Sequence, residues 1–107
     1  MTKVVVDAGI CGFSTAIEVV RLSARRVRII ITSDCEMVSK IGEQWKELDW
    51  QNILRQREGS SLYKSAFQCI RHIACPVPVA IIKAIEVEVG MALPRDVVIR
   101  FETTNYR

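Results

Sequence analysis

Short runs of β-branched residues alternate along the chain with stretches whose apolar residues recur every three or four positions. Residues 3–8 (KVVVDA) stop at Gly9, and residues 27–32 (VRIIIT) form a similar run, so each run predicts a buried strand. Between them, Thr15 and Glu18 have the spacing of a helix capping box, and apolar residues follow at helical spacing. We therefore expect a helix there, which makes a βαβ unit with parallel strands and a right-handed crossover.

The second half of the chain has a mainly helical pattern. Ser33 and Glu36 form another capping box at the start of a predicted helix over residues 33–48. A short helix is expected at about 50–58, ended by Gly59-Ser60-Ser61. Two longer helices are then predicted, and a last half-buried strand follows them. These last three segments cover residues 61–74, 76–89 and 97–102, and residues from Thr103 onward form a tail.

The pattern predicts an α/β fold. It has a βαβ start with a small sheet of about three strands, followed by three helices and a last strand, with the short helix at 50–58 as an addition. The chain has 107 residues, which is the size of one domain, so we take residues 1–107 as a single α/β domain.

Composition narrows the class of protein. Half of the residues are hydrophobic and the formal charge is only +3, which excludes a disordered chain. No uncharged stretch approaches the roughly 20 apolar residues of a membrane span, so no membrane association is expected. The N-terminus enters a strand-like run without the pattern of an export signal, and we therefore expect a cytoplasmic protein.

Four arginines form a basic cluster at positions 21, 25, 26 and 28. Such a cluster can contact nucleic acid, but it falls where the first helix is expected to end, and positive charge is favourable there. The sequence pI of 8.8 is modest, and no aromatic residues are interleaved with the arginines. Nucleic acid is therefore not an expected partner, whereas the sequence leaves a protein partner or a homo-oligomer open.

The four cysteines are the main chemical feature of the chain. In a reducing cytoplasm they are better explained as metal ligands, reactive thiols or core residues than as disulfides. Cys11 follows the first predicted strand and Cys35 the second, so both are expected at the carboxyl edge of the sheet, on adjacent parallel strands and with Cα atoms within about 10 Å. Cys75 lies at a predicted helix start, where the dipole favours a thiolate, and we expect it at the same edge.

The remaining candidates lie in the run C-x-x-H-x-x-C, formed by Cys69, His72 and Cys75. The five candidate metal ligands are Cys11, Cys35, Cys69, Cys75 and His72. Close C-x-x-C pairs of the kind typical of zinc sites are absent from the sequence, and thiolates from dispersed loops can hold an iron–sulfur cluster. The first hypothesis is therefore a four-cysteine metal-binding protein, with an iron–sulfur cluster favoured over zinc.

Two further hypotheses belong to other classes. A thiol or persulfide sulfur carrier, or a redox protein, would use Cys75 as its nucleophile. A structural or partner-binding domain would use the cysteines as core residues, which is the commonest environment of a free cysteine. A conventional enzyme is disfavoured, because a single His and the absence of paired catalytic carboxylates leave few groups for acid–base catalysis.

Three segments carry a resemblance to a known family: VVVDAGICGFSTAIEV, TSDCE and CIRHIACPVPVAIIKAIEVEVGMALPRDV. Together they resemble a family of short prokaryotic proteins, a domain of unknown function met largely in anaerobes and methanogens, over nearly the whole chain. The resemblance implies a cytoplasmic location. A second, weaker similarity is to the small sulfur-carrier proteins of tRNA thiolation, whose Cys-Pro-x-Pro motif matches Cys75 to Pro78 and which implies a persulfide on Cys75.

Overall fold

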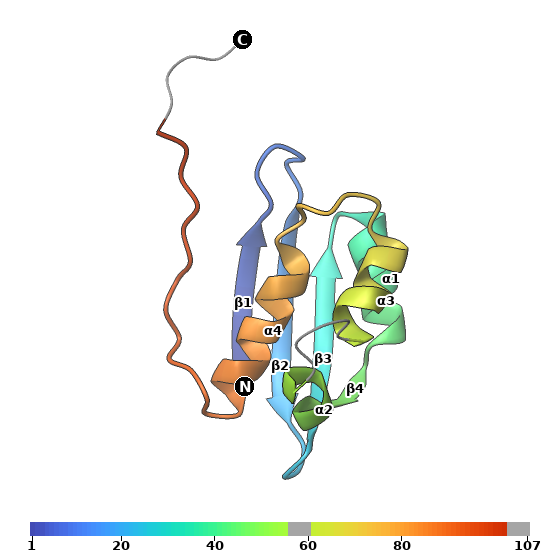
Figure 1. Ribbon diagram of the computed structural model, residues 1–107, viewed down its shortest axis with the longest axis vertical. Coiled ribbons are helices and arrows are strands. Elements are labelled where there is room, and N and C mark those ends of the chain that lie inside the picture. Colours follow the sequence, from blue (N-terminus) through green and yellow to red (C-terminus); the bar gives the residue numbers. More distant parts are fainter. Residues whose placement is uncertain (56–60, 103–107) are drawn as a thin grey trace.

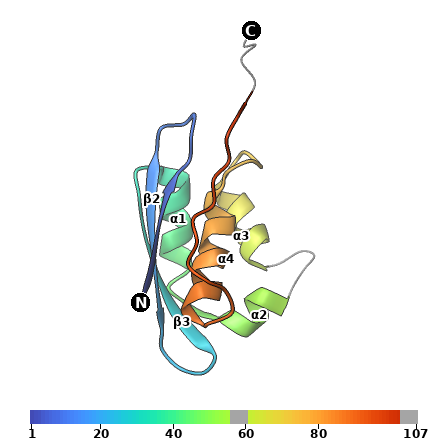
Figure 2. The ribbon, with the colours of Figure 1, turned by 90° about the vertical axis from the view of Figure 1, so that its left-hand side faces the viewer.

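The computed structural model describes residues 1–55 and 61–102 and has two layers, a twisted four-stranded sheet and a layer of helices (Figures 1 and 2). The elements in chain order are β1 (Thr2–Asp7), β2 (Ser14–Arg21), β3 (Arg26–Ser33), α1 (Glu36–Gln44), β4 (Glu47–Asp49), α2 (Trp50–Arg55), α3 (Ser61–Cys69) and α4 (Val77–Glu88). Figure 2 shows all four helices on one face of the sheet. The predicted mixed α/β fold that begins with a strand is confirmed.

The sheet is an antiparallel meander in the order β1-β2-β3-β4. Val4 lies opposite Ile17, and Ile17 lies opposite Ile31, so apolar residues line up across three strands. The predicted parallel βαβ start is therefore wrong. The segment that was expected to be a helix between the first two strands is β2.

Alternation explains why this segment is a strand. Thr15, Ile17 and Val19 are buried against the helices, while the residues between them lie on the other face of the sheet. This pattern has a period of two, and all three buried positions carry β-branched residues, as is typical of strands. The spacing of Thr15 and Glu18, which predicted a helix cap, is fortuitous.

The predicted helix over residues 33–48 is shorter in the structure. It begins at Glu36 and ends at Gln44, and the chain then forms β4, which pairs with the start of β3. The Ile29 N–H donates to the carbonyl of Lys46 at 2.8 Å. The chain leaves the helix because the outer edge of β3 needs hydrogen-bond partners there.

Four predictions for the second half of the chain need correction or cannot be compared. The helix predicted over 61–74 ends at Cys69, because the chain must turn back into α4, and residues 70–76 form that loop. Residues 97–102 are exposed and have no regular secondary structure, so the predicted last strand is not formed. The end of the helix predicted at 50–58 and the predicted tail cannot be compared. They fall on residues 56–60 and 103–107, which lie outside the described residues.

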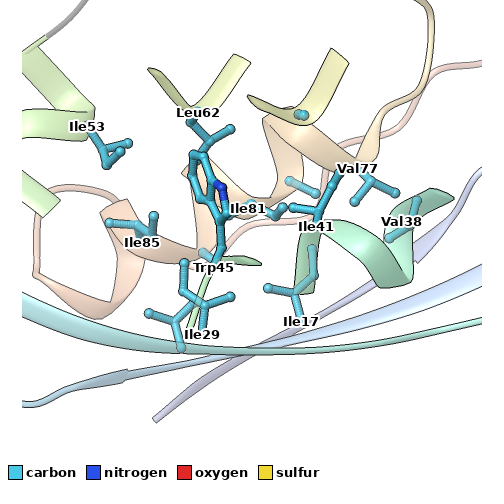
Figure 3. Close-up of a cluster of buried hydrophobic side chains, with 14 of the residues drawn as sticks. Ile17, Ile29, Val38, Ile41, Trp45, Ile53, Leu62, Val77, Ile81 and Ile85 are labelled. Carbon is cyan, nitrogen blue, oxygen red and sulfur yellow. The ribbon is translucent and has the colours of Figure 1, made fainter. Parts of the chain in front are cut away.

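The core lies between the sheet and the helices (Figure 3). Ile17 and Ile29 project from the sheet toward Ile41 of α1 and Ile81 and Ile85 of α4. All five are at most 2 % exposed, which corresponds to about 1.5–3 kcal/mol of transfer free energy for each side chain. This packing fixes α1 and α4 against the sheet and thereby positions the loops that precede them.

Candidate functional site

The strand directions bring the loops of Cys11 and Cys35 to one end of the molecule. Because β1 and β3 each run antiparallel to β2, they are parallel to each other and their carboxyl ends lie at the same end of the sheet. The two strands are not adjacent, so that part of the prediction is wrong, although the shared edge is confirmed. Figure 1 shows the loop before α4, which carries Cys75, at this same end.

The Cys11 loop is a hairpin connection between β1 and β2. Gly9 and Gly12 have φ angles of 89° and 74°, which a residue with a side chain rarely adopts, so the glycines permit the turn. The carboxylate of Asp7 accepts a hydrogen bond from the Gly9 N–H at 3.0 Å, which helps to fix the loop. The side chain of Cys11 is exposed at its tip.

The Cys35 loop is held by Ser33. The Ser33 hydroxyl accepts a hydrogen bond from the Cys35 N–H at 3.1 Å and shares a 2.7 Å hydrogen bond with the hydroxyl of Thr15, which is only 3 % exposed. The Ser33 carbonyl accepts from the Ser39 hydroxyl of α1 at 3.1 Å. Cys35 is the N-cap residue of α1, and its thiol makes no capping hydrogen bond. Ser33 is therefore not the predicted helix cap, but it orders the turn that presents Cys35.

Sequence reasoning missed this role of Thr15 and Ser33. Both residues are polar, whereas the residue two positions away in the same strand, which faces the same way, is apolar in each case. A buried hydroxyl needs a hydrogen-bond partner. With the strand assignment correct, the polar pair across β2 and β3 would have marked the edge of the sheet where Cys35 lies.

Cys75 lies just before α4, and its thiol is half-buried. The helix begins one residue later than predicted, with Pro76 as its N-cap. Burial raises the pKa of the Cys75 thiol, a hydrogen bond from the Val77 N–H lowers it, and the negative charges of Cys35 and Cys11 raise it further. The net effect is a raised pKa. Cys75 is thus influenced by the charges of the two other loop cysteines.

Cys69 and His72 are placed differently. Cys69 is the last residue of α3 and, like Cys35 and Cys75, packs partly against the core. His72 is exposed in the loop between α3 and α4. Within residues 1–55 and 61–102, no group of three or more His, Cys, Asp or Glu side chains is arranged so that it could hold a metal ion. The described part of the chain therefore does not bring the five candidate ligands into one preformed site.

Two hollows lie against the sheet, with volumes of about 540 and 200 Å³, and no cysteine lines either of them. The larger lies beside β3 and is lined in part by Ile31 and Gly42. The smaller is lined in part by Val5 and Thr32. The thiols therefore do not face either hollow.

The four clustered arginines contact neighbouring groups in the chain. Arg25 forms a 2.9 Å ion pair with Asp49, and Arg28 forms one of 3.1 Å with Glu47, which also lies 3.9 Å from Arg26. The Arg21 guanidinium lies over the Trp50 ring at 5.7 Å. The prediction that these arginines lie at the end of a helix is wrong. They lie at the β2–β3 turn and on its strands, where they connect the turn to β4 and α2.

The comparisons with known proteins identify one family. A Family of unknown function (DUF6951) has a profile that matches residues 2–101. The chain belongs to DUF6951. This confirms the resemblance to a domain of unknown function, and the match extends through the exposed C-terminal residues up to Phe101. No curated protein and no solved structure matches the chain, so the similarity to sulfur-carrier proteins has no support.

The part of the chain that the structure describes contains no helix that is both long and apolar enough to cross a membrane.

Proposed function

We propose that this DUF6951 chain binds a metal centre through the thiolates of Cys11, Cys35 and Cys75. The observation that carries the proposal is the convergence of three loops, far apart in sequence, at one end of the sheet (Figure 1). Each loop carries one cysteine. Cysteines that serve only as core residues have no reason to gather at the ends of three different elements.

The electrostatics of this end support a cation. Three thiolates that repel one another are stabilised when a positive ion neutralises their charge, because metal binding replaces thiol protons. Cys35 is the N-cap residue of α1 and Cys75 immediately precedes the N-cap of α4, so two positive helix ends favour the thiolate form that metal ligands require. An iron–sulfur cluster is favoured over zinc, since the cysteines come singly from dispersed loops and form no close pair.

The proposal requires movement of at least one loop, since the thiols are not arranged around a preformed site. The hairpin of Cys11 is the candidate for this movement, because its side chains at positions 10 and 11 are exposed and make no contribution to the core. Coordination would draw it toward Cys35 and Cys75. Cys69 is left out of the proposed ligand set, because it lies within α3 and not in one of the three converging loops.

The test is purification of the full chain without oxygen, followed by an absorption spectrum and by iron, zinc and acid-labile sulfide analysis. We expect a stoichiometric metal content in the natural chain. The single substitutions Cys11→Ser, Cys35→Ser and Cys75→Ser are each expected to lower it several-fold.

Cys69→Ser is the matched control and is expected to keep the metal. Protein with intact thiols that contains only traces of iron and zinc, and that takes up neither after anaerobic reconstitution, would contradict the proposal. Equal loss of metal in all four variants would contradict the three-ligand assignment.

The alternative of a sulfur carrier with Cys75 as the nucleophile gains no support from the surroundings of the Cys75 thiol. A nucleophilic cysteine needs a lowered pKa, whereas the pKa of Cys75 is raised, first by burial.

A further inference from the structure

The C-terminal segment, defined here as residues 91–102, is an extended and exposed chain beyond α4. Six large apolar side chains lie on it, all between 59 % and 79 % exposed: Met91, Leu93, Val97, Val98, Ile99 and Phe101. Single exposed apolar residues are common on protein surfaces, but a contiguous set of this size marks an interaction site. The family match includes most of the segment, since it extends to residue 101.

A second unpaired feature lies on β1. Within the described residues β1 pairs only with β2, so the opposite edge of this six-residue strand has no strand beside it. An open edge exposes backbone N–H and C=O groups that can pair with another strand. Figure 1 shows the C-terminal segment running on the same side of the molecule as this edge and in the same direction as β1. Figure 2 shows it displaced from the plane of the sheet toward the helices.

We propose that residues 96–100 add as a parallel strand to the open edge of β1 in a second copy of the chain, and that two copies exchange these strands reciprocally. Because the segment and β1 run in the same direction within one chain, a two-fold axis parallel to both would place each segment beside the other copy's β1 in the parallel direction. Such an exchange is closed and symmetric, so it stops at a dimer.

The charges select one register for this pairing. With Val97 beside Val4 and Ile99 beside Val6, the apolar side chains of the segment extend the face of the sheet that packs on the helices. The same register places Asp96 beside Lys3. It also places Arg100 beside Asp7. Two opposite charge pairs therefore flank an apolar centre, whereas the antiparallel arrangement with Ile99 beside Val4 would bring Arg100 to Lys3 and Asp96 to Asp7.

The chain has the reach that exchange requires. The α4 helix ends near the start of β1, because the Thr2 hydroxyl donates to the Glu88 carboxylate at 2.7 Å. Gly90, with a φ of 82°, then turns the chain out of the helix. Pro94 favours an extended conformation of the residue before it. A 12-residue extended segment spans about 40 Å, which is enough to cross onto a neighbouring molecule.

The second copy is favoured over pairing with the segment's own β1. The chain's own edge is within reach, yet residues 91–102 are all exposed and lie outside the plane of the sheet. The inference is independent of the proposed metal centre, because it involves none of the cysteines.

The test measures the mass of the full chain by light scattering and sedimentation over a concentration range of about 1 to 200 µM. We expect a dimer that dissociates on dilution. Ile99→Asp, which places a charge in the apolar centre, is expected to raise the dimer dissociation constant at least tenfold. Ile73→Asp is the matched control, since Ile73 is 88 % exposed in the loop before α4 and takes no part in the proposed pairing, and it is expected to leave the constant unchanged.

A charge exchange tests the register. Lys3→Glu and Asp96→Lys are each expected to weaken the dimer, and the combination of both is expected to restore it. Circular dichroism and thermal unfolding verify that each variant is folded. A natural chain that is monomeric over the whole concentration range overturns the proposal. This holds also if hydrogen exchange shows that the amides of residues 97–100 of such a monomer are protected, because the segment then pairs with its own β1. A dimer that Ile99→Asp leaves intact overturns it as well.

Discussion

At the scale of single residues, the structure shows that polar side chains in the sheet organise the cysteine end. The hydroxyls of Thr15 and Ser33 satisfy each other within the sheet, and Ser33 also accepts the Cys35 N–H. A buried hydroxyl without a partner costs free energy because it has lost its hydrogen bonds to water. The position of Cys35 is therefore linked to the stability of the strands behind it.

This link predicts the effect of Ser33→Ala. The substitution removes the partner of the buried Thr15 hydroxyl and the acceptor for Cys35, and we expect the free energy of unfolding to fall by about 1–3 kcal/mol. Replacing both partners, as in Ser33→Ala with Thr15→Val, is expected to cost less than the sum of the two single changes. Urea unfolding of the four proteins measures this.

Thr32→Val is the control for Ser33→Ala. Thr32 is exposed on the other face of β3, and its substitution is expected to change stability by no more than about 0.5 kcal/mol. A Ser33→Ala variant as stable as the natural chain would show that the pair has no structural role.

At the scale of elements, sequence reasoning succeeded where start and stop signals are local. Pro76 and Gly90 bracket α4 closely, and the apolar spacing found the centre of α1. It failed at β2, because Thr15 and Glu18 fit a helix cap as well as a strand. The choice between them depends on pairing with β1 and β3, which lie elsewhere in the sequence. The same non-local effect ended α1 early, since β3 required a partner strand.

Gly42 offers a test of how α1 packs on β3. A Cβ atom at this position would lie 3.1 Å from the Cβ of Ile31 and 3.5 Å from its carbonyl oxygen. Replacing an interior helical Gly by Ala normally stabilises a protein by about 0.5–1 kcal/mol. We expect Gly42→Ala to gain none of this, because the strand atoms it meets cannot move freely.

Gly42→Val is expected to destabilise the chain by about 1–3 kcal/mol through overpacking. Thermal unfolding measures both variants, with Lys40→Ala on the exposed face of α1 as the control. A Gly42→Ala variant that is more stable than the natural chain by the full helix-propensity gain would mean that α1 packs less closely on β3.

At the scale of the whole molecule, the sequence predicted the shared end of Cys11 and Cys35 from a topology that proved wrong. The outcome is the same because two strands that flank a common antiparallel neighbour run in one direction. Cys75 could be placed only through the packing of α4 across the sheet, which depends on core residues such as Ile81 and Ile85. The α3 helix ends earlier than predicted, and no local signal in the sequence marks this end. For this reason Cys69 is the last residue of the helix and His72 lies exposed in the loop after it.

The raised pKa of Cys75 gives the proposed metal centre a definite pH dependence. The thiol must lose its proton to bind a metal ion, and its pKa lies above its ordinary value because the thiol is half-buried and near Cys35 and Cys11. Below that pKa, the dissociation constant for Zn²⁺ falls about tenfold for each unit of increase in pH and for each proton that the metal displaces. We therefore expect affinity to rise steadily from about pH 6 to pH 8. Competition titrations with a zinc chelator measure it, and Cys75→Ser is expected to weaken binding and to reduce the slope of log affinity against pH by about one. Cys69→Ser is expected to follow the natural chain, and a Cys75→Ser variant with an unchanged slope would show that this thiol is not a ligand.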